Sequence, residues 1–498
     1  MAPDSSPRTR AGKVLIVGAG PAGLTAAAEL AENGVAVDVL EQDPEYVGGI
    51  ARTVHYKGYR FDIGGHRFFS KSAEITAWWR RRLPDDFIQV RRMSRIFYRG
   101  KFFDYPLRAA NALFNLGVFT SGLCMLSYLR ARIFPIRPEK SFADWVTNRF
   151  GRRLFLIFFK TYTEKVWGMP CGQISADWAA QRIKGLSLLK AVWHALLPQG
   201  NRSGGALVKT LIDSFEYPRL GPGMMWEKTR DDLRAAGHGV QLGTAAEAIL
   251  HDGVKVRAVR SRGAGGVVRE WEADHFILSL PLRETVLRME PPLAPAVQEA
   301  ARRLQYRDFV TVALMVRRTA LFPDNWIYVH DPSVKLGRIQ NFNNWSPEMV
   351  PGTDTTCLGL EYFCFEGDGL WTMADADLVE LGKKELAQLG LVEAAEVFDG
   401  CVVRMPKAYP VYGPGYQEDV NIIRGGLSAL GNLQVVGRNG MHKYNNQDHS
   451  MMTALLAARN LTGQSFDLWK VNTDAEYHEE GEADDRGKGR MVPRAAES

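Results

Sequence analysis

The segment from Gly437 to Ser450 combines residue types that could bind an anion and a cofactor. It reads GRNGMHKYNNQDHS, follows the apolar run from Leu433 to Val436, and precedes a helical pattern from Met451 to Leu461. A strand, a polar turn with glycines and a helix start are typical of a place where backbone N–H groups face an anionic group. The segment from Val14 to Leu24, VLIVGAGPAGL, supplies the matching half. Together the two segments predict one nucleotide-binding domain that is closed by both chain ends.

Three glycines in the N-terminal segment, Gly18, Gly20 and Gly23, have the spacing of a dinucleotide-binding turn. The first permits a tight bend, the second lets the backbone approach a pyrophosphate, and the third lets the helix pack on the strand. Glu41 ends the second strand, where an acid is expected to bind ribose hydroxyls. The surrounding pattern predicts a strand, a helix and a second strand at 13–17, 23–33 and 35–40.

Two further glycine pairs follow, at 48–49 and 64–65. Paired glycines let the backbone run against a flat ring system, because no Cβ intervenes. Dehydrogenases that use only a nicotinamide do not need these extra turns, whereas flavin enzymes often do, so FAD is favoured over NAD. The residues predicted to contact it here are Gly49, Arg52, Gly64 and Gly65, with His66 beside them.

Composition limits the classes of partner. The 498 residues include 62 basic and 56 acidic ones, a formal charge of +6, and no basic cluster beyond Arg80-Arg81-Arg82. This balance argues against nucleic-acid binding and fits a small phosphate-bearing substrate better. The five cysteines are scattered without metal-ligand spacing, so we expect no metal site, and buried thiols in a reducing cytoplasm. The N-terminus has no apolar stretch typical of a secretion signal.

The predicted fold class is α/β, with a Rossmann-like FAD-binding domain of the GR2 type, a helical insertion and a mixed or antiparallel substrate-facing sheet. The predicted ranges are 12–70, 205–280 and 425–470 for the discontinuous FAD-binding domain, 71–204 for a mainly helical substrate domain, and 281–424 for the sheet domain. Strands of that sheet are predicted at 310–316, 326–329 and 357–363. Residues 1–11 and 474–498 are expected to be disordered, because their composition is polar or charged.

The stretch from Ala109 to Leu126 contains no charged residue. A transmembrane helix would be more uniformly apolar, because polar and small residues interrupt this stretch at Asn111, Asn115, Gly117, Ser121 and Gly122. We therefore expect buried helices here, with peripheral membrane contact as the alternative.

Taken together, these segments resemble the flavin-dependent UDP-galactopyranose mutases, particularly the eukaryotic type, within the amine-oxidase and protoporphyrinogen-oxidase-like FAD superfamily. The likeness is distributed from Val14 to Leu461. Four blocks carry it: the glycine-glycine-histidine loop at 64–66, the YTEKVW block at 162–167 with 178–182, the segments 326–328 and 338–347, and the C-terminal loop at 437–450.

The resemblance implies a nucleotide-diphosphate sugar as substrate and an interconversion of its pyranose and furanose forms. In that chemistry reduced FAD holds the sugar as an N5 adduct, and NAD(P)H is the expected reductant. The leaving diphosphate needs positive charge, and arginine binds phosphate oxygens with its planar fork. We therefore predict that Arg338 and Arg438 form a phosphate clamp, that Arg182 is a third such arginine, and that His66 lies beside the flavin.

The resemblance also predicts two sets of binding residues. The C-terminal cofactor contacts are Gly437, Asn446, Gln447 and Asp448. The predicted substrate contacts are Tyr105, Trp167, Tyr328, Tyr409 and Tyr444.

The sequence departs from the mutase pattern at two positions, and it is compatible with two other functions. Leu107 and Arg108 stand where the eukaryotic pattern has aromatic and amide residues near the uracil, so the base or the sugar could differ. An FAD-dependent oxidoreductase of the amine oxidase, protoporphyrinogen oxidase or desaturase type is the alternative, although it leaves Arg338 and Arg438 unexplained. A flavoprotein without catalytic activity, which organises glycan assembly, is the third possibility. The oligomeric state is left undetermined.

Overall fold

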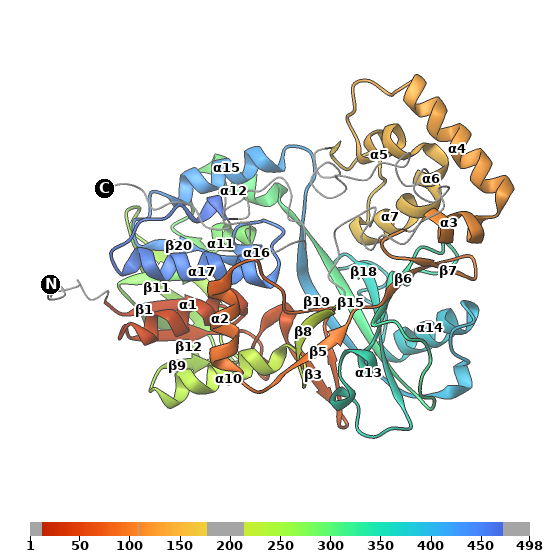
Figure 1. Ribbon diagram of the computed structural model, residues 1–498. Coiled ribbons are helices and arrows are strands. Elements are labelled where there is room, and N and C mark those ends of the chain that lie inside the picture. The colour runs from red at the N-terminus through yellow and green to blue at the C-terminus, as the bar shows by residue number, and fades with distance from the viewer. Residues whose placement is uncertain (1–11, 108, 177–213, 472–498) are drawn as a thin grey trace, which may run out of the picture.

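The computed structural model describes residues 12–107, 109–176 and 214–471. A parallel sheet with its helices, a larger mixed sheet, and a group of helices beside the larger sheet make up this part of the chain (Figure 1). The predicted α/β class is confirmed. The predictions for Arg182 and for the ends at 1–11 and 474–498 lie outside the described residues.

The five-stranded parallel sheet joins the two ends of the chain, as the sequence predicts. In spatial order its strands are β20 (Leu433–Val435), β13 (His275–Leu278), β1 (Val14–Val17), β2 (Val37–Leu40) and β9 (Gly239–Gln241). The central strands consist mostly of aliphatic residues, because both faces of the sheet are covered. Helices α1 (Pro21–Glu32) and α17 (Gln447–Leu461) contact each other on one face, and α10 (Gly223–Ala235) packs beside α1.

The opposite face is covered by a four-stranded sheet and three helices. The strands are β12 (Val268–Glu272), β11 (Val256–Arg262), β10 (Ala245–His251) and β14 (Met289–Glu290), and the helices are α11 (Leu282–Leu287), α12 (Pro295–Arg303) and α15 (Tyr416–Leu427). The sequence predicts that residues 281–424 form the substrate-facing sheet domain. Helices α11 and α12 at the start of this range, and most of α15 at its end, pack on the parallel sheet instead, so both boundaries of that prediction are wrong. The physical reason is that Val286 and Ile423 belong to the same buried cluster as Leu15 and Leu278 of the parallel sheet.

The larger sheet has seven strands and is mixed, as predicted. Its strands in order are β19 (Val397–Val411), β15 (Gln305–Val316), β18 (Thr356–Cys364), β17 (Arg338–Asn341), β16 (Trp326–Val329), β6 (Ser94–Tyr98) and β7 (Lys101–Asp104). The pair β16 and β6 is parallel, and all other neighbours are antiparallel. The predicted strand 326–329 matches β16, and the other two predicted strands extend further than expected.

Strands β6 and β7 come from the range 71–204, which was predicted to be mainly helical. They form a hairpin around Arg99 and Gly100, whose φ angles of 49° and 73° both lie in the left-handed region. Two such residues suit the right-handed twist of a two-residue hairpin. The same range also holds helix α2 (Ala73–Arg82) and strand β5 (Phe87–Arg91), which pairs with β8 (Ser214–Pro218). The range 71–204, predicted to be mainly helical, therefore also contains the three strands β5, β6 and β7.

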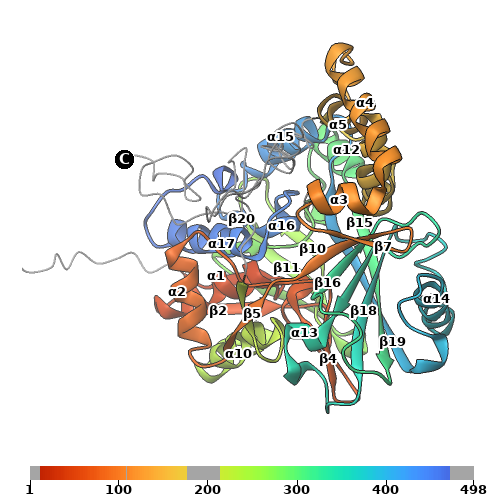
Figure 2. The ribbon, with the colours of Figure 1, turned by 45° about the vertical axis from the view of Figure 1, so that its right-hand side comes forward.

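The remainder of that range, up to residue 176, forms the helical unit (Figure 2). Its elements are α3 (Ala109–Leu116), α4 (Val118–Ile133), α5 (Phe142–Phe150), α6 (Arg152–Leu154), a π-helical turn (Phe155–Lys160) and α7 (Thr161–Trp167). Lys165 attaches α7 to the larger sheet. Its Nζ donates to the carbonyl oxygens of Val329 (3.2 Å), Asp331 (2.7 Å) and Leu336 (2.9 Å). Burial lowers the pKa of Lys165 to about 8.

The stretch from Ala109 to Leu126 is helical, but the prediction that it is buried is wrong. It forms α3 and the first half of α4, and Phe114, Phe119 and Leu126 are exposed. Only one side of α4, with Cys124 and Tyr128, is buried. Within the described ranges, no helix has both the length and the apolar character that a membrane span requires.

Gly23 offers a test of the turn that joins β1 to α1. A Cβ at this position would lie 1.8 Å from the carbonyl oxygen of Gly18, which is backbone and cannot rotate away. We expect Gly23→Ala to lower the free energy of unfolding by about 2–3 kcal/mol through overpacking, as measured by denaturant titration.

Gly425→Ala is the matched control, because Gly425 is also helical and a Cβ there meets nothing within 4 Å. It should be neutral or stabilise by up to about 1 kcal/mol. Equal stability of the two variants would contradict the packing argument.

Candidate functional site

The turn after β1 is fixed by hydrogen bonds from the neighbouring strand. Gly18 N donates to the carbonyl of Leu40 (2.7 Å), and Ala19 N donates to Glu41 Oε2 (2.7 Å). Gly20 faces Gly49, whose Cα would lie 4.0 Å from a Cβ on Gly20. The structure therefore brings the predicted cofactor residues Gly18, Gly20, Glu41 and Gly49 together beside the N-terminus of α1.

Both carboxylate oxygens of Glu41 accept hydrogen bonds from the backbone, which the sequence did not predict. Its second oxygen, Oε1, accepts from Asp43 N (3.0 Å), and burial raises the pKa of the carboxyl group. Each oxygen still has a lone pair for a ribose hydroxyl. Arg52, also predicted to contact the cofactor, forms an ion pair with Asp43 and lies 5.4 Å from the centre of the Tyr46 ring. Its clearest role is to hold this loop.

The C-terminal loop packs against the same helix. Gly437 has a φ of 80°, and a Cβ there would lie 2.9 Å from the Cβ of Ala22 in α1. The turn continues through α16 (Gly437–Gly440) to the start of α17, where Asn446 N donates to His449 Nδ1 (3.3 Å). Asp448 is buried, and its Oδ1 accepts from His449 N (2.9 Å).

Gln447 provides an observation that bears on the cofactor. Its Oε1 accepts from Trp226 Nε1 (3.1 Å), while its Nε2 is buried and has no hydrogen-bond partner among the described residues. A buried donor without a partner is costly and indicates a missing acceptor. Together with the open approach at Gly20 and Gly49, this donor set fits a bound dinucleotide such as FAD.

The loop that carries His66 follows Asp62, a buried residue that is fixed by two side-chain hydrogen bonds. The Asp62 carboxylate accepts from Thr53 Oγ1 (2.8 Å) and Tyr217 Oη (2.5 Å), and burial raises its pKa to about 7. Beyond it, Gly64 has a φ of 85°, and a Cβ there would lie 3.6 Å from Arg338 Nη2 and 3.8 Å from His66 Nε2. The glycine thus lets the loop approach the larger sheet closely.

His66 and the neighbouring Gly65 complete this part of the site. A Cβ on Gly65 would lie 3.1 Å from both Gln340 Nε2 and the Trp345 ring. His66 Nε2 lies 2.9 Å from the carbonyl oxygen of Ile63 and can donate to it. Burial lowers the pKa of His66 to about 4, and the charges of Arg438 and Arg338 add to this effect. The imidazole is therefore neutral at neutral pH.

Arg338 is paired with a buried carboxylate, Glu361. Arg338 Nη2 and Nε donate to Glu361 Oε2 (2.5 and 2.8 Å), and Gln340 Nε2 donates to Oε1 (2.9 Å). The register of β17 and β18 places Arg338 opposite Glu361, and that of β16 and β17 places Tyr328 opposite Arg338. Glu361 was missed from the sequence, although a single acid within the apolar run of 357–363 is an available signal.

Arg438 lies on the other side of the site and has no such acid among its described contacts. Its Nε donates to the carbonyl of Asn445 (2.8 Å) and its Nη1 to that of Ala408 (3.2 Å). The guanidinium carbon lies 5.2 Å from the ring centre of Tyr409 and 5.0 Å from that of Tyr444. Both Arg338 and Arg438 act on the pKa of His66 and of Tyr409, so the structure places the two predicted arginines near the same two residues.

Aromatic side chains lie beside these arginines, and we call them the aromatic wall: Tyr105, Tyr162, Tyr328, Tyr409 and Tyr444. The rings of Tyr409 and Tyr444 are nearly parallel, with centres 5.8 Å apart, and burial raises the pKa of Tyr409 to about 12. Tyr328 contacts Tyr105 and Tyr162, with ring centres 4.8 and 5.4 Å apart. Four of the five predicted substrate residues therefore lie in this wall or beside Arg438.

Two corrections concern the helical unit. Tyr162 belongs to the YTEKVW block but is not among the predicted site residues. It lies in the wall, stacked on His330 with ring centres 4.8 Å apart. Trp167 was predicted to bind substrate, but it is buried in the core of the helical unit with Phe142 and Trp145.

The family follows from a match that covers most of the chain. Residues 21–461 fit the model of the flavin containing amine oxidoreductases. The chain belongs to this family. As a member of the flavin containing amine oxidoreductases it is a flavin-dependent enzyme, which agrees with the donor set around Gln447.

Proteins that are similar to this chain differ in the chemistry that their names describe. Coproporphyrinogen III oxidase from Mycobacterium leprae (strain TN) is 26% identical over 443 residues, which cover 83% of this chain and 90% of that protein. The structure of reduced UDP-galactopyranose mutase aligns with a TM-score of 0.76 at 22% identity, over 91% of this chain and 95% of that one. A protoporphyrinogen oxidase structure from Exiguobacterium sp. 255-15, itself described as putative, aligns with a TM-score of 0.66 at 17% identity, over 91% and 98%. The structural likenesses establish the fold.

His330 gives a pH-dependent test of the aromatic wall. Burial lowers its pKa to about 3, and the charge of Lys165 adds to this. The unfolded chain therefore takes up a proton below pH 6.5 that the folded protein does not, so the contribution of His330 to stability is complete above pH 6.5 and is lost as the pH falls. Relative to His330→Gln, the wild type should lose about 2 kcal/mol of unfolding free energy between pH 6.5 and 5.

The measurement is guanidinium unfolding of both proteins at several pH values, with His55→Gln as a control at an exposed histidine. A difference between wild type and His330→Gln that stays constant over this range would show that His330 is not held neutral.

Proposed function

We propose that this protein is an FAD-dependent nucleotide-sugar mutase that interconverts pyranose and furanose forms. The observation that supports it is that Arg338 and Arg438 both lie near His66 and Tyr409, with Tyr328 beside Arg338 and Tyr444 beside Arg438. An apolar substrate would not require two guanidinium groups in a largely buried site, where each carries a desolvation cost.

Each residue has a defined task in this proposal. The ion pair with Glu361 uses Nε and Nη2 of Arg338, so Nη1 is the group that can donate to a phosphate oxygen. Arg438 adds a positive charge from the opposite side, and Tyr328, Tyr409 and Tyr444 can donate hydroxyl hydrogen bonds to the same oxygens. These preorganised donors would stabilise the charge that develops on a departing diphosphate.

The cofactor would lie between the glycine turns and the loop at 64–66. When bound and reduced, FAD would supply the nucleophile for the sugar. Gly64 and Gly65 let this loop lie close to the larger sheet, and neutral His66, whose Nε2 is hydrogen bonded to Ile63, adds no charge there. Reduction by NAD(P)H and a cytoplasmic location are further parts of this proposal.

A porphyrinogen oxidase-type activity is the second candidate. Two observations favour it: the relative from Mycobacterium leprae, and the neutralisation of Arg338 by Glu361, which weakens a phosphate clamp. The stacked Tyr409 and Tyr444 rings could also hold a planar substrate. Its substrate would be oxidised and oxygen consumed, whereas the mutase reaction has no net redox change.

One experiment separates the two candidates. The purified holoenzyme is reduced with dithionite, incubated without oxygen with UDP-, dTDP- and GDP-hexoses, and the products are separated by chromatography. A parallel sample receives coproporphyrinogen III in air, and oxygen consumption is recorded. Furanose products without oxygen consumption support the mutase, and oxygen consumption without furanose products supports the oxidase.

Arg338→Lys tests the clamp. Lysine keeps the charge but loses the planar fork, so we expect kcat/KM for the nucleotide sugar to fall about 100-fold or more. The matched control is Arg95→Lys. Arg95 forms a similar pair with buried Asp324 (2.6–3.2 Å), but its register position, opposite Ile327 rather than Tyr328, places it on the other face of the same sheet.

The control variant should keep kcat/KM within about twofold, because it leaves the site unchanged. Flavin absorbance and thermal unfolding verify that both variants are folded and loaded. Equal losses in the two variants would show that Arg338 acts through stability alone.

A further inference from the structure

The helical unit carries a row of large apolar side chains on its outer surface, which we call the apolar ridge. Phe114 of α3 is 88% exposed, and Val118 and Phe119 of α4 are 92% and 81% exposed. Gly117, with a φ of 79°, forms the corner between these helices. The ridge continues through Leu126, Leu129, Ile133, Phe134 and Ile136, which are 42–70% exposed.

The ridge is one face of a helix whose other face is already packed. Phe119, Leu126 and Ile133 recur at helical spacing, so they lie along one side of α4. Cys124, Tyr128 and Ala131 are buried on the other side, towards α5 and α6. A surface helix normally presents polar residues to water. An apolar outer face of this length therefore marks an interaction site.

Helix α4, which carries most of the ridge, lies at the margin of the molecule (Figure 2). Side chains that are more than four-fifths exposed stand out from a convex surface and do not line a groove. A convex apolar surface can insert into the acyl layer of a membrane. A site that binds a partner helix would need a concave groove. Since no described helix can cross a membrane, contact would be limited to one leaflet.

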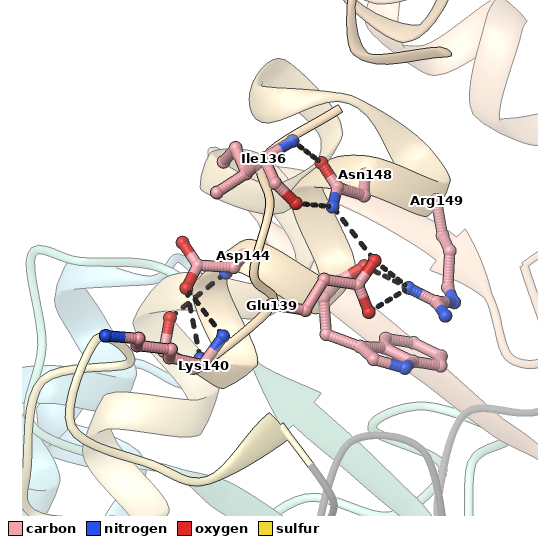
Figure 3. A network of polar contacts seen from close by, with 8 residues as sticks. Ile136, Glu139, Lys140, Asp144, Asn148 and Arg149 are labelled. Atoms are coloured by element: carbon pink, nitrogen blue, oxygen red, sulfur yellow. Dashed lines mark hydrogen bonds and ion pairs between the residues drawn. The ribbon is translucent and has the colours of Figure 1, made fainter. Parts of the chain in front are cut away.

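The loop after α4 is held in a fixed position (Figure 3). Asn148 Oδ1 accepts from Ile136 N (2.8 Å), and its Nδ2 donates to Ile136 O (2.9 Å) and to Glu139 Oε1 (2.9 Å). Arg149 Nη1 donates to both oxygens of Glu139 (2.8 and 3.0 Å). This network fixes the loop that presents Phe134 and Ile136, so little ordering is needed on binding.

The charges around the ridge have one sign. The chain has no acidic residue between Ala109 and Pro138, whereas Arg130, Arg132 and Arg137 are exposed there. The acids that follow this stretch are engaged within the protein: Glu139 by Arg149 and Asn148, and Asp144 by the backbone N–H groups of Lys140 and Ser141. The acid that precedes it, Asp104, is half-buried at the end of β7. Arginines beside an apolar helical face suit anionic lipid headgroups above an acyl layer.

We propose that the apolar ridge attaches this protein to the surface of an anionic lipid bilayer. Phe114, Val118 and Phe119 enter the boundary between headgroups and acyl chains, and Arg130, Arg132 and Arg137 bind lipid phosphates. The attachment places Tyr105, the outermost tyrosine of the aromatic wall, near the headgroup layer, because it precedes α3 by four residues. The inference stands independently of the substrate proposed above.

Vesicle co-sedimentation of the full-length, FAD-loaded protein tests this inference. The probes are vesicles of phosphatidylcholine alone and of phosphatidylcholine with phosphatidylglycerol at about 70:30, in low and high salt. We expect binding to the anionic vesicles that weakens with salt. The triple variant Phe114→Ser, Phe119→Ser, Ile133→Ser should lower the partition coefficient at least about tenfold.

Two further variants make the result specific. The control is Val254→Ser, Val267→Ser, Phe398→Ser, which removes exposed apolar side chains from other elements and should bind like the wild type. The variant Arg130→Gln, Arg132→Gln, Arg137→Gln should lose the preference for anionic vesicles.

Three outcomes would overturn the proposal. They are no binding of the wild type at low salt, equal effects of the ridge and control variants, or a dimer in analytical ultracentrifugation that the ridge variant dissociates without any vesicle binding. The last result would assign the ridge to a second copy of the chain. Unchanged thermal unfolding verifies that the ridge variant is folded.

Discussion

The ion pair between Arg338 and Glu361 is the interaction on which the candidate site depends. Glu361 lies in the interior of the seven-stranded sheet with a side chain that is only 1% exposed. A buried carboxylate without a partner would be strongly destabilising, so the register of β17 and β18 and the orientation of Arg338 are set by the same requirement. Gln340 occupies the other oxygen of the carboxylate. The guanidinium group therefore faces the site in a fixed orientation before any substrate binds.

The rest of the site is brought to this pair by close backbone packing. Gly64 lets the loop that carries His66 approach Arg338, and the network of Asp62, Thr53 and Tyr217 holds that loop from the other side. Gly437 similarly lets the C-terminal loop, with Arg438, pack against α1. Two parts of the chain far apart in sequence thus meet where the parallel sheet and the seven-stranded sheet adjoin.

Local signals in the sequence were sufficient for the parallel sheet. The spacing of Gly18, Gly20 and Gly23 between two apolar runs predicts a βαβ unit, because each requirement lies within a few residues of the next. The resemblance, and not periodicity, predicted that Arg338 and Arg438 would meet. It could not show that Glu361 neutralises one of them, since that pairing depends on the register of two strands.

The errors have a common physical origin. An apolar helix carries no local signal for which of its faces another element covers, so the sequence predicts that the stretch from Ala109 to Leu126 is buried, although Phe114, Phe119 and Leu126 are exposed. Trp167 was taken for a substrate contact and Tyr162 was not, although they lie on the same short helix. Their roles depend on which side of α7 faces the larger sheet, and that is decided by Lys165 and the three carbonyl oxygens that it binds.

The charge of the site is what distinguishes its candidate functions. Arg338 is balanced by Glu361, His66 is neutral, and the described contacts of Arg438 are carbonyl oxygens and tyrosine rings. The excess charge is therefore close to that of one guanidinium group, surrounded by hydroxyl donors. Pairing with Glu361 weakens the attraction of Arg338 for a diphosphate, so the unbalanced charge of Arg438 matters most for a phosphate-bearing substrate. In the proposed mutase reaction, Arg438 and the tyrosine hydroxyl groups would act on the charge that grows on the leaving diphosphate.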